Sequence, residues 1–148
     1  MPASGWSTRP ARPGDVGALA DLKLHALRVD LERAGVWRPS YNRARFVREF
    51  VPSETTVVVD DDGGVVGCLA VHPEGGTTWL RHFYLREEAR GRGIGTRLVT
   101  DAVASATTPT VTLDVLTGSR VESLYRRLGF EPVSDDGIDT IMRLDLPR

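Results

Sequence analysis

The stretch "REEARGRGIGTRL", residues 86–98, holds three glycines at alternate positions and then continues as an amphipathic segment. The three positions are Gly91, Gly93 and Gly95. Apolar residues follow at helical spacing from Ile94, which predicts a helix with one buried face. The preceding "TTWLRHFYL" (77–85) is typical of a strand. We therefore expect a strand, a glycine-rich loop and the start of a helix in direct succession.

Such a helix start favours an anionic ligand. The first-turn N–H groups of a helix have no intrahelical acceptor, and the helix dipole leaves partial positive charge there. Glycines allow ligand oxygens to approach the backbone, because no Cβ stands in the way. Arg90, Arg92 and Arg97 add positive charge to the segment. This combination predicts a site for a diphosphate.

The spacing of the glycines separates three kinds of phosphate loop. A dinucleotide fingerprint, G-x-G-x-x-G, requires glycine at the position of Thr96, and a P-loop requires a lysine that the segment lacks. The pattern that fits is R-x-x-G-x-G, formed by Arg90, Gly93 and Gly95. The alternative is a turn that only joins the strand to the helix.

Composition limits the class of protein. The chain has 148 residues, 41% of them hydrophobic and 26% charged, as in a single globular domain. The formal net charge of -1 argues against a dedicated nucleic-acid binder. Cys68 is the only cysteine, so no internal disulfide can form, and a reducing, cytoplasmic location is expected. The apolar run at 65–71 is too short to cross a membrane. Three scattered histidines show no metal-ligand spacing, which predicts no metal.

The first half of the chain predicts a strand, two helices and then strands. A strand is expected at 6–11, and Asp15 is a plausible N-cap for the first helix. The second helix is expected at 42–51. "DDDGG" and "PEGG" (73–76) predict turns between three antiparallel strands, which places His72 beside a turn.

The second half predicts a strand at 110–116, then a helix from Val121 that Gly129 closes, and a final hairpin around 135–137. The element order is therefore β-α-α-β-β-β-α-β-α-β-β. It implies an α/β fold with a mixed sheet and helices on both faces, in one domain of residues 1–148 with its core at about 6–146.

A second motif downstream supports the interpretation of the glycine-rich loop as a ligand site. "SLYRRLGF" (123–130) lies on the next predicted helix after the glycine-rich one, with one strand between them. Together the two segments resemble the GNAT-type N-acetyltransferases, which use acetyl-CoA, and the element order matches the GNAT acyltransferase fold. The resemblance implies that the loop holds the coenzyme's pyrophosphate through Arg90, Gly91, Arg92, Gly93, Ile94, Gly95 and Thr96. It also implies that the fourth strand pairs with the pantetheine arm through Phe83, Tyr84 and Leu85.

The resemblance makes Tyr125 the general acid that protonates the departing thiolate. A purely structural role, filling the core beside Val121 and Leu128, is the alternative.

Two positions depart from the pattern of the family. Gly118 stands where members often carry a coenzyme-binding Asn, so Ser119 is the substitute candidate, and Val121 replaces a smaller residue.

Three routes could remove the proton of the incoming ammonium. His82 is the first candidate, because its ordinary pKa near 6.5 suits base chemistry at neutral pH. A histidine satisfied within the sheet is its alternative. Asp114 is second, by resemblance to an acidic residue on strand five of a branch that acetylates ribosomal-protein N-termini, with a solvated or capping carboxylate as its alternative. A chain of waters is the third route.

The resemblance places the acceptor near the linker of the first two helices. Glu32, Trp37 and Tyr41 suit a cationic amine, with an ordinary linker surface as the alternative. The resulting hypothesis is an N-acetyltransferase that moves acetyl from acetyl-CoA to a primary amine, of a small molecule or a peptide N-terminus, in a ternary complex. A non-catalytic acyl-CoA sensor and, with less support, a nucleotide binder are the competing hypotheses. No nucleic-acid or membrane partner is expected, and a homodimer is compatible with the family.

Overall fold

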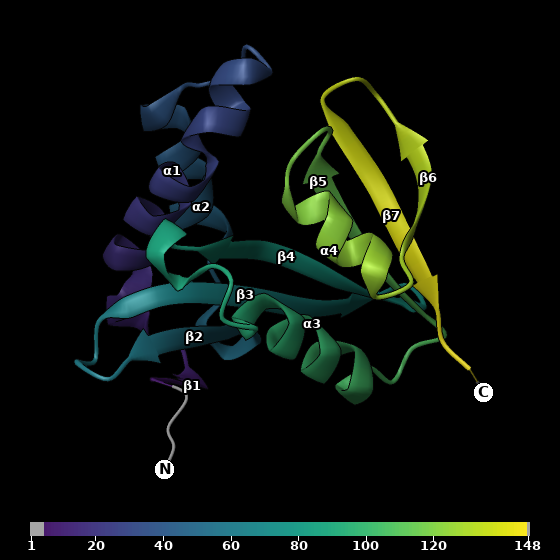
Figure 1. Ribbon diagram of the computed structural model, residues 1–148, viewed down its shortest axis with the longest axis horizontal. Helices are drawn as coiled ribbons and strands as arrows, with labels where there is room; N and C mark the ends of the chain where they lie inside the picture. The colour runs from purple at the N-terminus through teal and green to yellow at the C-terminus, as the bar shows by residue number, and fades with distance from the viewer. Residues whose placement is uncertain (1–4, 148) are drawn as a thin grey trace. The chain divides into compact units, whose positions relative to one another are not determined.

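The computed structural model describes residues 5–147, so the ends of the predicted domain, 1–4 and 148, lie outside the described residues. Within them, seven strands form one mixed sheet of order β1-β2-β3-β4-β5-β7-β6 (Figure 1). The strands are β1 (Trp6–Pro10), β2 (Thr55–Asp60), β3 (Val65–Glu74), β4 (Thr77–Leu85), β5 (Thr110–Leu116), β6 (Glu131–Asp135) and β7 (Asp139–Asp145). The α-helices are α1 (Val16–Arg33), α2 (Pro39–Glu49), α3 (Ile94–Ser105) and α4 (Val121–Arg127). This is the predicted order of elements.

The chain divides into two compact units, whose boundaries cut through β3 and β4. The first unit contains the chain up to Ala70 together with His82–Arg90. The second contains Val71–Arg81 and the chain from Gly91 onward. Each of the candidate site residues therefore belongs to one unit or the other.

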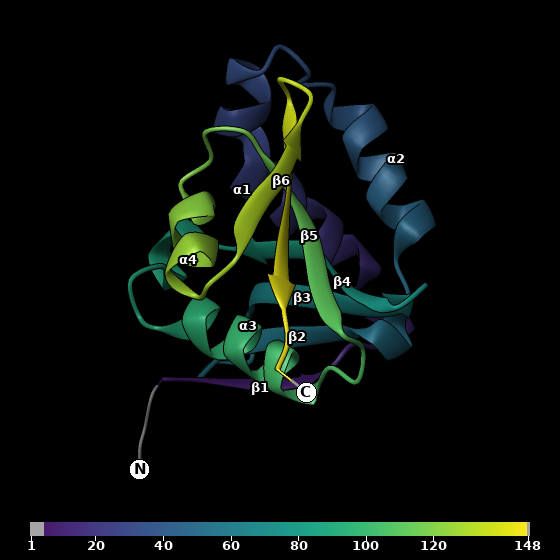
Figure 2. The ribbon, with the colours of Figure 1, turned by 90° about the vertical axis from the view of Figure 1, so that its right-hand side faces the viewer.

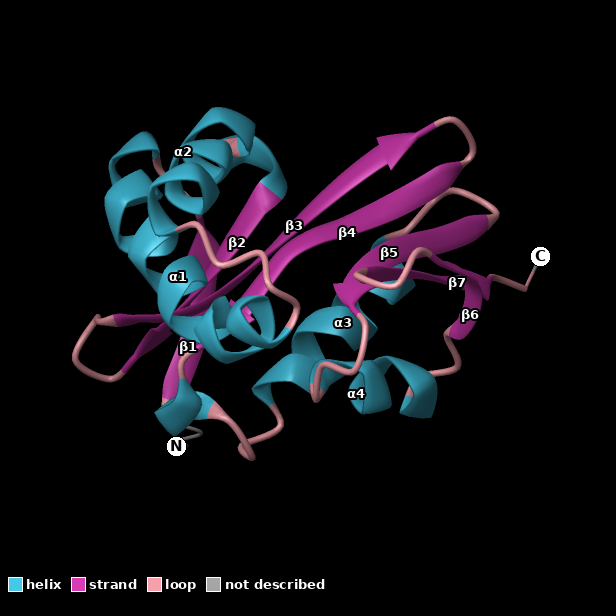
Figure 3. Cartoon of the chain, turned by 90° about the horizontal axis from the view of Figure 1, so that it is seen from above, coloured by secondary structure: helices cyan, strands magenta, loops and turns pink. Residues whose placement is uncertain are grey.

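In the first unit, α1 and α2 pack beside the strands (Figure 3). β1 pairs antiparallel with β2, and β2 pairs antiparallel with β3. The core combines residues from both helices and from three strands: Leu19, Ala20, Leu22, Phe46, Val57, Cys68 and Tyr84. Helices and strands meet there because each contributes one apolar face.

Helix α1 begins directly after Asp15, as predicted, but Asp15 does not cap it with its side chain. Its carboxylate accepts from the backbone N–H of Arg12 at 2.7 Å and from the Arg9 guanidinium at 2.8 and 2.9 Å. The acid thus closes the short 3-10 turn η1 (Pro13–Asp15). The predicted start of α1 is therefore confirmed, but the Asp15 carboxylate binds Arg9 and Arg12 and not the first turn of the helix.

Helix α2 starts at Pro39, three residues before the prediction, and ends at Glu49. Proline suits the first helical position, where its missing N–H would have no partner. The side-chain oxygen of Asn42 accepts from the backbone N–H of Arg38 at 2.9 Å, which ties down the residue before the helix. The predicted range 42–51 was wrong because it ignored this preference of proline.

Strand β3 continues through His72 and Pro73 to Glu74, so the predicted four-residue turn at 73–76 was wrong. Gly75 and Gly76 have φ values of 60° and 87°. A type I′ hairpin turn needs positive φ at both central positions, and Gly75 and Gly76 supply it without the flanking Pro73 and Glu74. His72 consequently lies in the strand, with Nε2 3.3 Å from Oε1 of Glu74.

In the second unit, β5 pairs with β4 and β7 (Figure 2). The parallel pairing with β4 runs from Thr77↔Thr110 to Leu80↔Leu113. β5 and β6 both pair antiparallel with β7, as expected for a final hairpin. Gly129 follows α4 with a φ of 100°, which confirms the predicted end of that helix.

Candidate active site

The loop before α3 has the geometry that its glycines predicted. Gly91 and Gly93 adopt φ values of 76° and 80°, and Gly93 is the N-cap residue of α3. L-residues rarely adopt this backbone region, so glycine is needed at both positions. A Cβ added at either one would meet no atom within 4 Å. The loop therefore presents bare backbone to open space.

The helix start also has donors that lack a partner. The first backbone bond at this end of α3 runs from the N–H of Arg97 to the carbonyl oxygen of Gly93, at 3.0 Å. In the described chain, the amides of Ile94, Gly95 and Thr96 donate to no protein acceptor. Ile94 and Gly95 are buried, which anchors the helix start, whereas Thr96 is exposed. Three neighbouring donors at a helix N-terminus form a site suited to an anion.

Side-chain charge near the loop comes from arginine. Arg97 pairs with Asp101, with Nε 3.1 Å from Oδ2, so part of its charge is compensated. Arg90 is half-buried and makes no ion pair within residues 5–147. Arg90, in the first unit, therefore carries a charge that no described acidic side chain compensates.

Tyr125 lies on α4 and is only 4% exposed. Its ring meets Phe130 edge to face, with centroids 5.8 Å apart. Burial, and next the negative charge of Asp114, raises the pKa of Tyr125 above its ordinary value of 10.0. The phenol is therefore protonated at neutral pH and able to donate a hydrogen bond.

Asp114 and Ser119 lie in the same unit as Tyr125. Asp114 is exposed on β5, opposite Ile141 of β7. Ser119 is buried in the turn before α4, where its Oγ lies 3.4 Å from the backbone N–H of Val121. The structure thus brings Asp114 into electrostatic contact with Tyr125 and places Ser119 at the start of α4.

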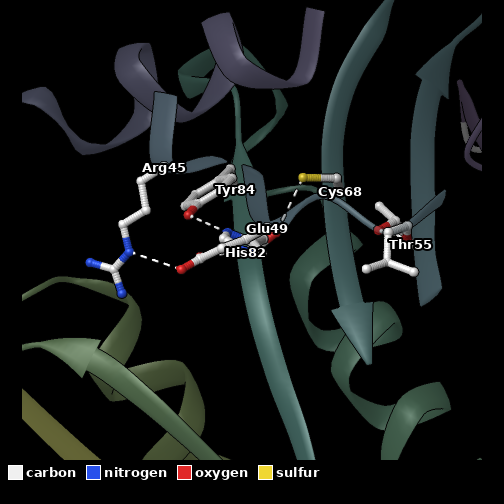
Figure 4. Close-up of polar contacts among 7 residues, drawn as sticks. Arg45, Glu49, Thr55, Cys68, His82 and Tyr84 are labelled. Atoms are coloured by element: carbon white, nitrogen blue, oxygen red, sulfur yellow. Dashed lines mark hydrogen bonds and ion pairs between the residues drawn. The ribbon is translucent and has the colours of Figure 1, made fainter. Parts of the chain in front are cut away.

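His82 occupies an unusual backbone position in the first unit. Its φ is 51°, and it is the one non-glycine residue with positive φ in the described part of the chain. The Cys68 thiol donates a hydrogen bond to the His82 carbonyl oxygen, with Sγ 3.2 Å away (Figure 4). A left-handed histidine inside a strand carries strain, and such strain concentrates at functional sites.

The His82 ring contacts polar groups at both nitrogens. Nε2 lies 3.2 Å from Oε1 of Glu49, and Nδ1 lies 3.1 Å from the hydroxyl of Tyr84. The ring also meets Phe46 edge to face, with centroids 5.0 Å apart. Only 12% of the His82 side chain is exposed. The first base candidate is thus a largely but not fully buried imidazole within a polar cluster.

Glu49 is a site residue that sequence reasoning missed. It ends α2, and it also accepts from Nε of Arg45 at 3.1 Å, one helical turn earlier. The i, i+4 spacing of Arg45 and Glu49 was visible in the sequence, but it indicates only a surface ion pair. Contact with His82 depends on how α2 packs against β4, which no local pattern encodes.

The end of β4 holds the predicted pantetheine-binding segment. Tyr84 is 8% exposed, and its hydroxyl is engaged by His82. Leu85 lies close to β3, because a Cβ added at Gly67 would come within 2.5 Å of Leu85 Cδ2. The backbone N–H of Arg86 donates to Val66 at 2.9 Å. Glycine at position 67 therefore allows this close approach.

The predicted acceptor-binding residues already contact arginines. Glu32 pairs with Arg28 at 3.4 Å, and the Arg28 guanidinium carbon lies 5.3 Å from the centre of the Trp37 ring. Arg38 lies 4.5 Å from the centre of the Tyr41 ring. These aromatic faces bind cations of the protein itself.

The described residues contain neither a metal-binding cluster nor a membrane-spanning helix. Between residues 5 and 147, no group of three His, Cys, Asp or Glu side chains is placed to hold a metal ion. No helix in the same range is long and apolar enough to span a membrane.

The family model described as an acetyltransferase (GNAT) domain matches residues 52–132, which include the loop, β4 and Tyr125. The chain belongs to the GNAT acetyltransferase family. This GNAT protein is 30% identical, over 115 residues, to an uncharacterized N-acetyltransferase of Schizosaccharomyces pombe, a match that covers 69% of this chain and 71% of the relative.

Solved structures share the GNAT fold. One is the PaiA N-acetyltransferase of Thermoplasma acidophilum in complex with coenzyme A, with a TM-score of 0.77, 19% identity and coverage of 95% of this chain and 99% of that one. Another is a GCN5-related N-acetyltransferase of Kribbella flavida, with a TM-score of 0.72, 21% identity and coverage of 96% and 98%. At these identities the likeness shows the fold, and it confirms the predicted fold class.

Proposed function

We propose that this GNAT protein transfers an acetyl group from acetyl-CoA to a primary amine, by direct attack of the amine within a ternary complex. The observation that carries the proposal is the start of α3, where the amides of Ile94, Gly95 and Thr96 have no protein acceptor beside two glycines with open space at the Cβ. A diphosphate would satisfy these donors. The neighbouring structure that contains coenzyme A supports the choice of this coenzyme.

The remaining coenzyme contacts are assigned by the family resemblance. Arg90 and Arg92 would add charge at the diphosphate, and Phe83–Leu85 would line the pantetheine arm. Ser119 is buried, and its hydroxyl lies 3.4 Å from the backbone N–H of Val121 at the start of α4. Coenzyme affinity is therefore expected to depend mainly on the backbone of the loop.

Transfer requires a neutral amine and a departing sulfur. His82 is the proposed proton acceptor, with Asp114 as the second candidate, and Tyr125 is the proposed donor to the sulfur. The raised pKa of Tyr125 keeps its proton in place. A thiol has an ordinary pKa of about 8.5, so complete transfer from this phenol to a thiolate is uphill. Tyr125 is better suited to stabilise charge on the sulfur by a hydrogen bond as the thioester bond breaks.

The proposed acceptor is an amine of a small molecule or of a peptide N-terminus. Trp37 and Tyr41 contact Arg28 and Arg38, so a cationic amine would have to displace a guanidinium to stack on either ring. A panel of amines, with release of coenzyme thiol as the readout, would identify the class of acceptor. The cytoplasm is the proposed location, in keeping with a single cysteine, Cys68, that is free and buried.

Two measurements test the proposal. Calorimetry with acetyl-CoA, NAD and ATP should show tight binding of acetyl-CoA alone. A panel of amines should then release free coenzyme thiol with at least one member, at a rate above the amine-free control. Binding of acetyl-CoA without thiol release across the whole panel would favour the acyl-CoA sensor, and preference for NAD or ATP would contradict both.

A further inference from the structure

The three side chains Glu49, His82 and Tyr84 form a connected polar chain within the first unit (Figure 4). The carboxylate comes from α2, and the other two groups come from β4. The Tyr84 hydroxyl lies 3.1 Å from Nδ1 of His82, so the two side chains meet on the same side of the strand. The histidine is the central member, with Glu49 at Nε2 and the Tyr84 hydroxyl at Nδ1.

The partners determine where the protons lie. An ionised carboxylate can only accept, so Nε2 of His82 carries a proton toward Glu49. In the neutral ring Nδ1 is then an acceptor, and the Tyr84 hydroxyl donates to it at 3.1 Å. This tautomer leaves His82 with one basic nitrogen, and the basic nitrogen faces a hydroxyl.

Neighbouring cations keep Glu49 ionised. Burial favours the neutral acid, but the hydrogen bond and charge of Arg45, followed by the charges of His82 and Lys23, lower the pKa of Glu49 overall. Lys23 is a buried lysine of α1, and burial is the main cause that lowers its own pKa. The titratable groups in contact with His82 thus include Glu49, Tyr84 and the Cys68 thiol, and Arg45 and Lys23 act on it through Glu49.

We propose that Glu49 is the positioning residue for His82, and that the Tyr84 hydroxyl passes the proton of the incoming ammonium to Nδ1 of His82. This inference rests on the proposed function. One N–H bond of the ammonium breaks, and its proton joins the Tyr84 oxygen while the phenol's own proton moves to Nδ1. The products are a neutral amine, an unchanged phenol and an imidazolium paired with the Glu49 carboxylate. No other reactant is needed.

A purely structural cluster would have the same contacts, so the test must follow the proton. Glu49→Gln keeps a hydrogen-bond acceptor for Nε2 and removes the charge. The NMR titration midpoint of the His82 ring should fall by about 0.5–1 pH unit, because an adjacent opposite charge favours the protonated ring and Glu49 is partly exposed. The acidic limb of the kcat/KM profile, measured with the best amine of the panel, should move by the same amount.

Two further variants identify the role of each group. Glu49→Asp keeps the charge and should restore most of the midpoint. Tyr84→Phe should lower kcat by about 10- to 100-fold with a small change in KM, because proton transfer to a positioned group contributes factors of this order or larger. Asp21→Asn is the matched control, because Asp21 of α1 pairs with Arg43 of α2 at 3.1 Å and makes no polar contact with His82. It should leave the midpoint and the profile unchanged.

The outcomes separate the inference from the proposed function. An unchanged His82 midpoint in Glu49→Gln would overturn the positioning role whether or not the protein is active. A shifted midpoint with a fixed kinetic profile would overturn the relay while leaving acetyl transfer intact. If no amine releases thiol, the proposed function and the relay fail together, and the midpoint still reports the Glu49–His82 pairing.

Discussion

Replacing Gly93 by alanine tests the loop most directly, because one residue combines a strained backbone with open space. The added Cβ would meet no protein atom within 4 Å, so the folded chain has room for it. At a φ of 80° an L-residue costs roughly 1–2 kcal/mol in conformational energy. Part of this cost is offset because alanine also restricts the unfolded chain. We expect a net loss of about 1 kcal/mol, or about 2–4 °C in Tm.

The chain offers a matched control in Gly63, in the turn between β2 and β3. Its φ is 82°, and a Cβ there would likewise meet nothing within 4 Å. Gly63→Ala should therefore lose as much stability as Gly93→Ala. The two variants differ only in whether the methyl group lies beside the free amides at the start of α3.

Coenzyme affinity should separate the two variants. A methyl group at Gly93 would hold the diphosphate away from at least one amide, and a hydrogen bond to a charged group contributes about 1.5–3 kcal/mol. The Kd for acetyl-CoA should rise roughly 10- to 100-fold in Gly93→Ala and stay unchanged in Gly63→Ala, as measured by calorimetry. If both variants lose the same stability and both bind within about twofold of the parent, the loop is not the diphosphate site.

Three other predictions concern single side chains. Tyr125→Phe should lower kcat by about 100-fold or more and leave the Kd for acetyl-CoA unchanged; equal turnover with the best amine would remove the donor role. Asp15 has its pKa lowered from 3.8 to about 2, chiefly by the hydrogen bond from Arg9, so its ionised form stabilises the fold above pH 4 and this contribution disappears as the pH falls toward 2. Between pH 4 and pH 2, the free energy of unfolding measured in urea should fall by about 2 kcal/mol less in Asp15→Asn than in the parent. Equal falls in the two proteins would contradict the role of the Asp15 carboxylate. Burial raises the pKa of Cys68 to about 12, so a thiol reagent at pH 8 should label it only after unfolding, and rapid labelling of the folded chain would contradict its burial.

The sequence predicted the loop well because its geometry is local. The helix start at Ile94 and the exposed glycine backbone before it depend on residues within one turn of each other. The end of α4 at Gly129 was predicted for the same reason. The errors at Pro39 and Pro73 were also local, and both arose from treating proline only as a breaker of regular structure. Proline at a first helical position, or near the end of a strand before a glycine turn, obeys a positional rule instead.

The cluster of Glu49, His82 and Tyr84 could not be predicted from the sequence, because tertiary packing brings its members together. Glu49 is a charged residue at the end of a polar helix, and nothing in its neighbourhood distinguishes it from Glu32, which pairs with Arg28 on the surface. The partner of His82 depends on Phe46, whose buried ring fixes α2 against β4. The sequence predicted a helix in this region, but not which polar residue at its end would meet the strand.

The left-handed backbone at His82 connects the fold to the proposed chemistry. A positive φ at a non-glycine strand residue costs of the order of 1–3 kcal/mol, and it persists only where surrounding contacts hold it. Here the Cys68 thiol holds the carbonyl oxygen, while Glu49 and Tyr84 hold the ring. Glycine at this position would remove the strain, but it would also remove the imidazole. The strained residue carries the basic nitrogen of this cluster, which is the nitrogen that the proposed proton transfer requires.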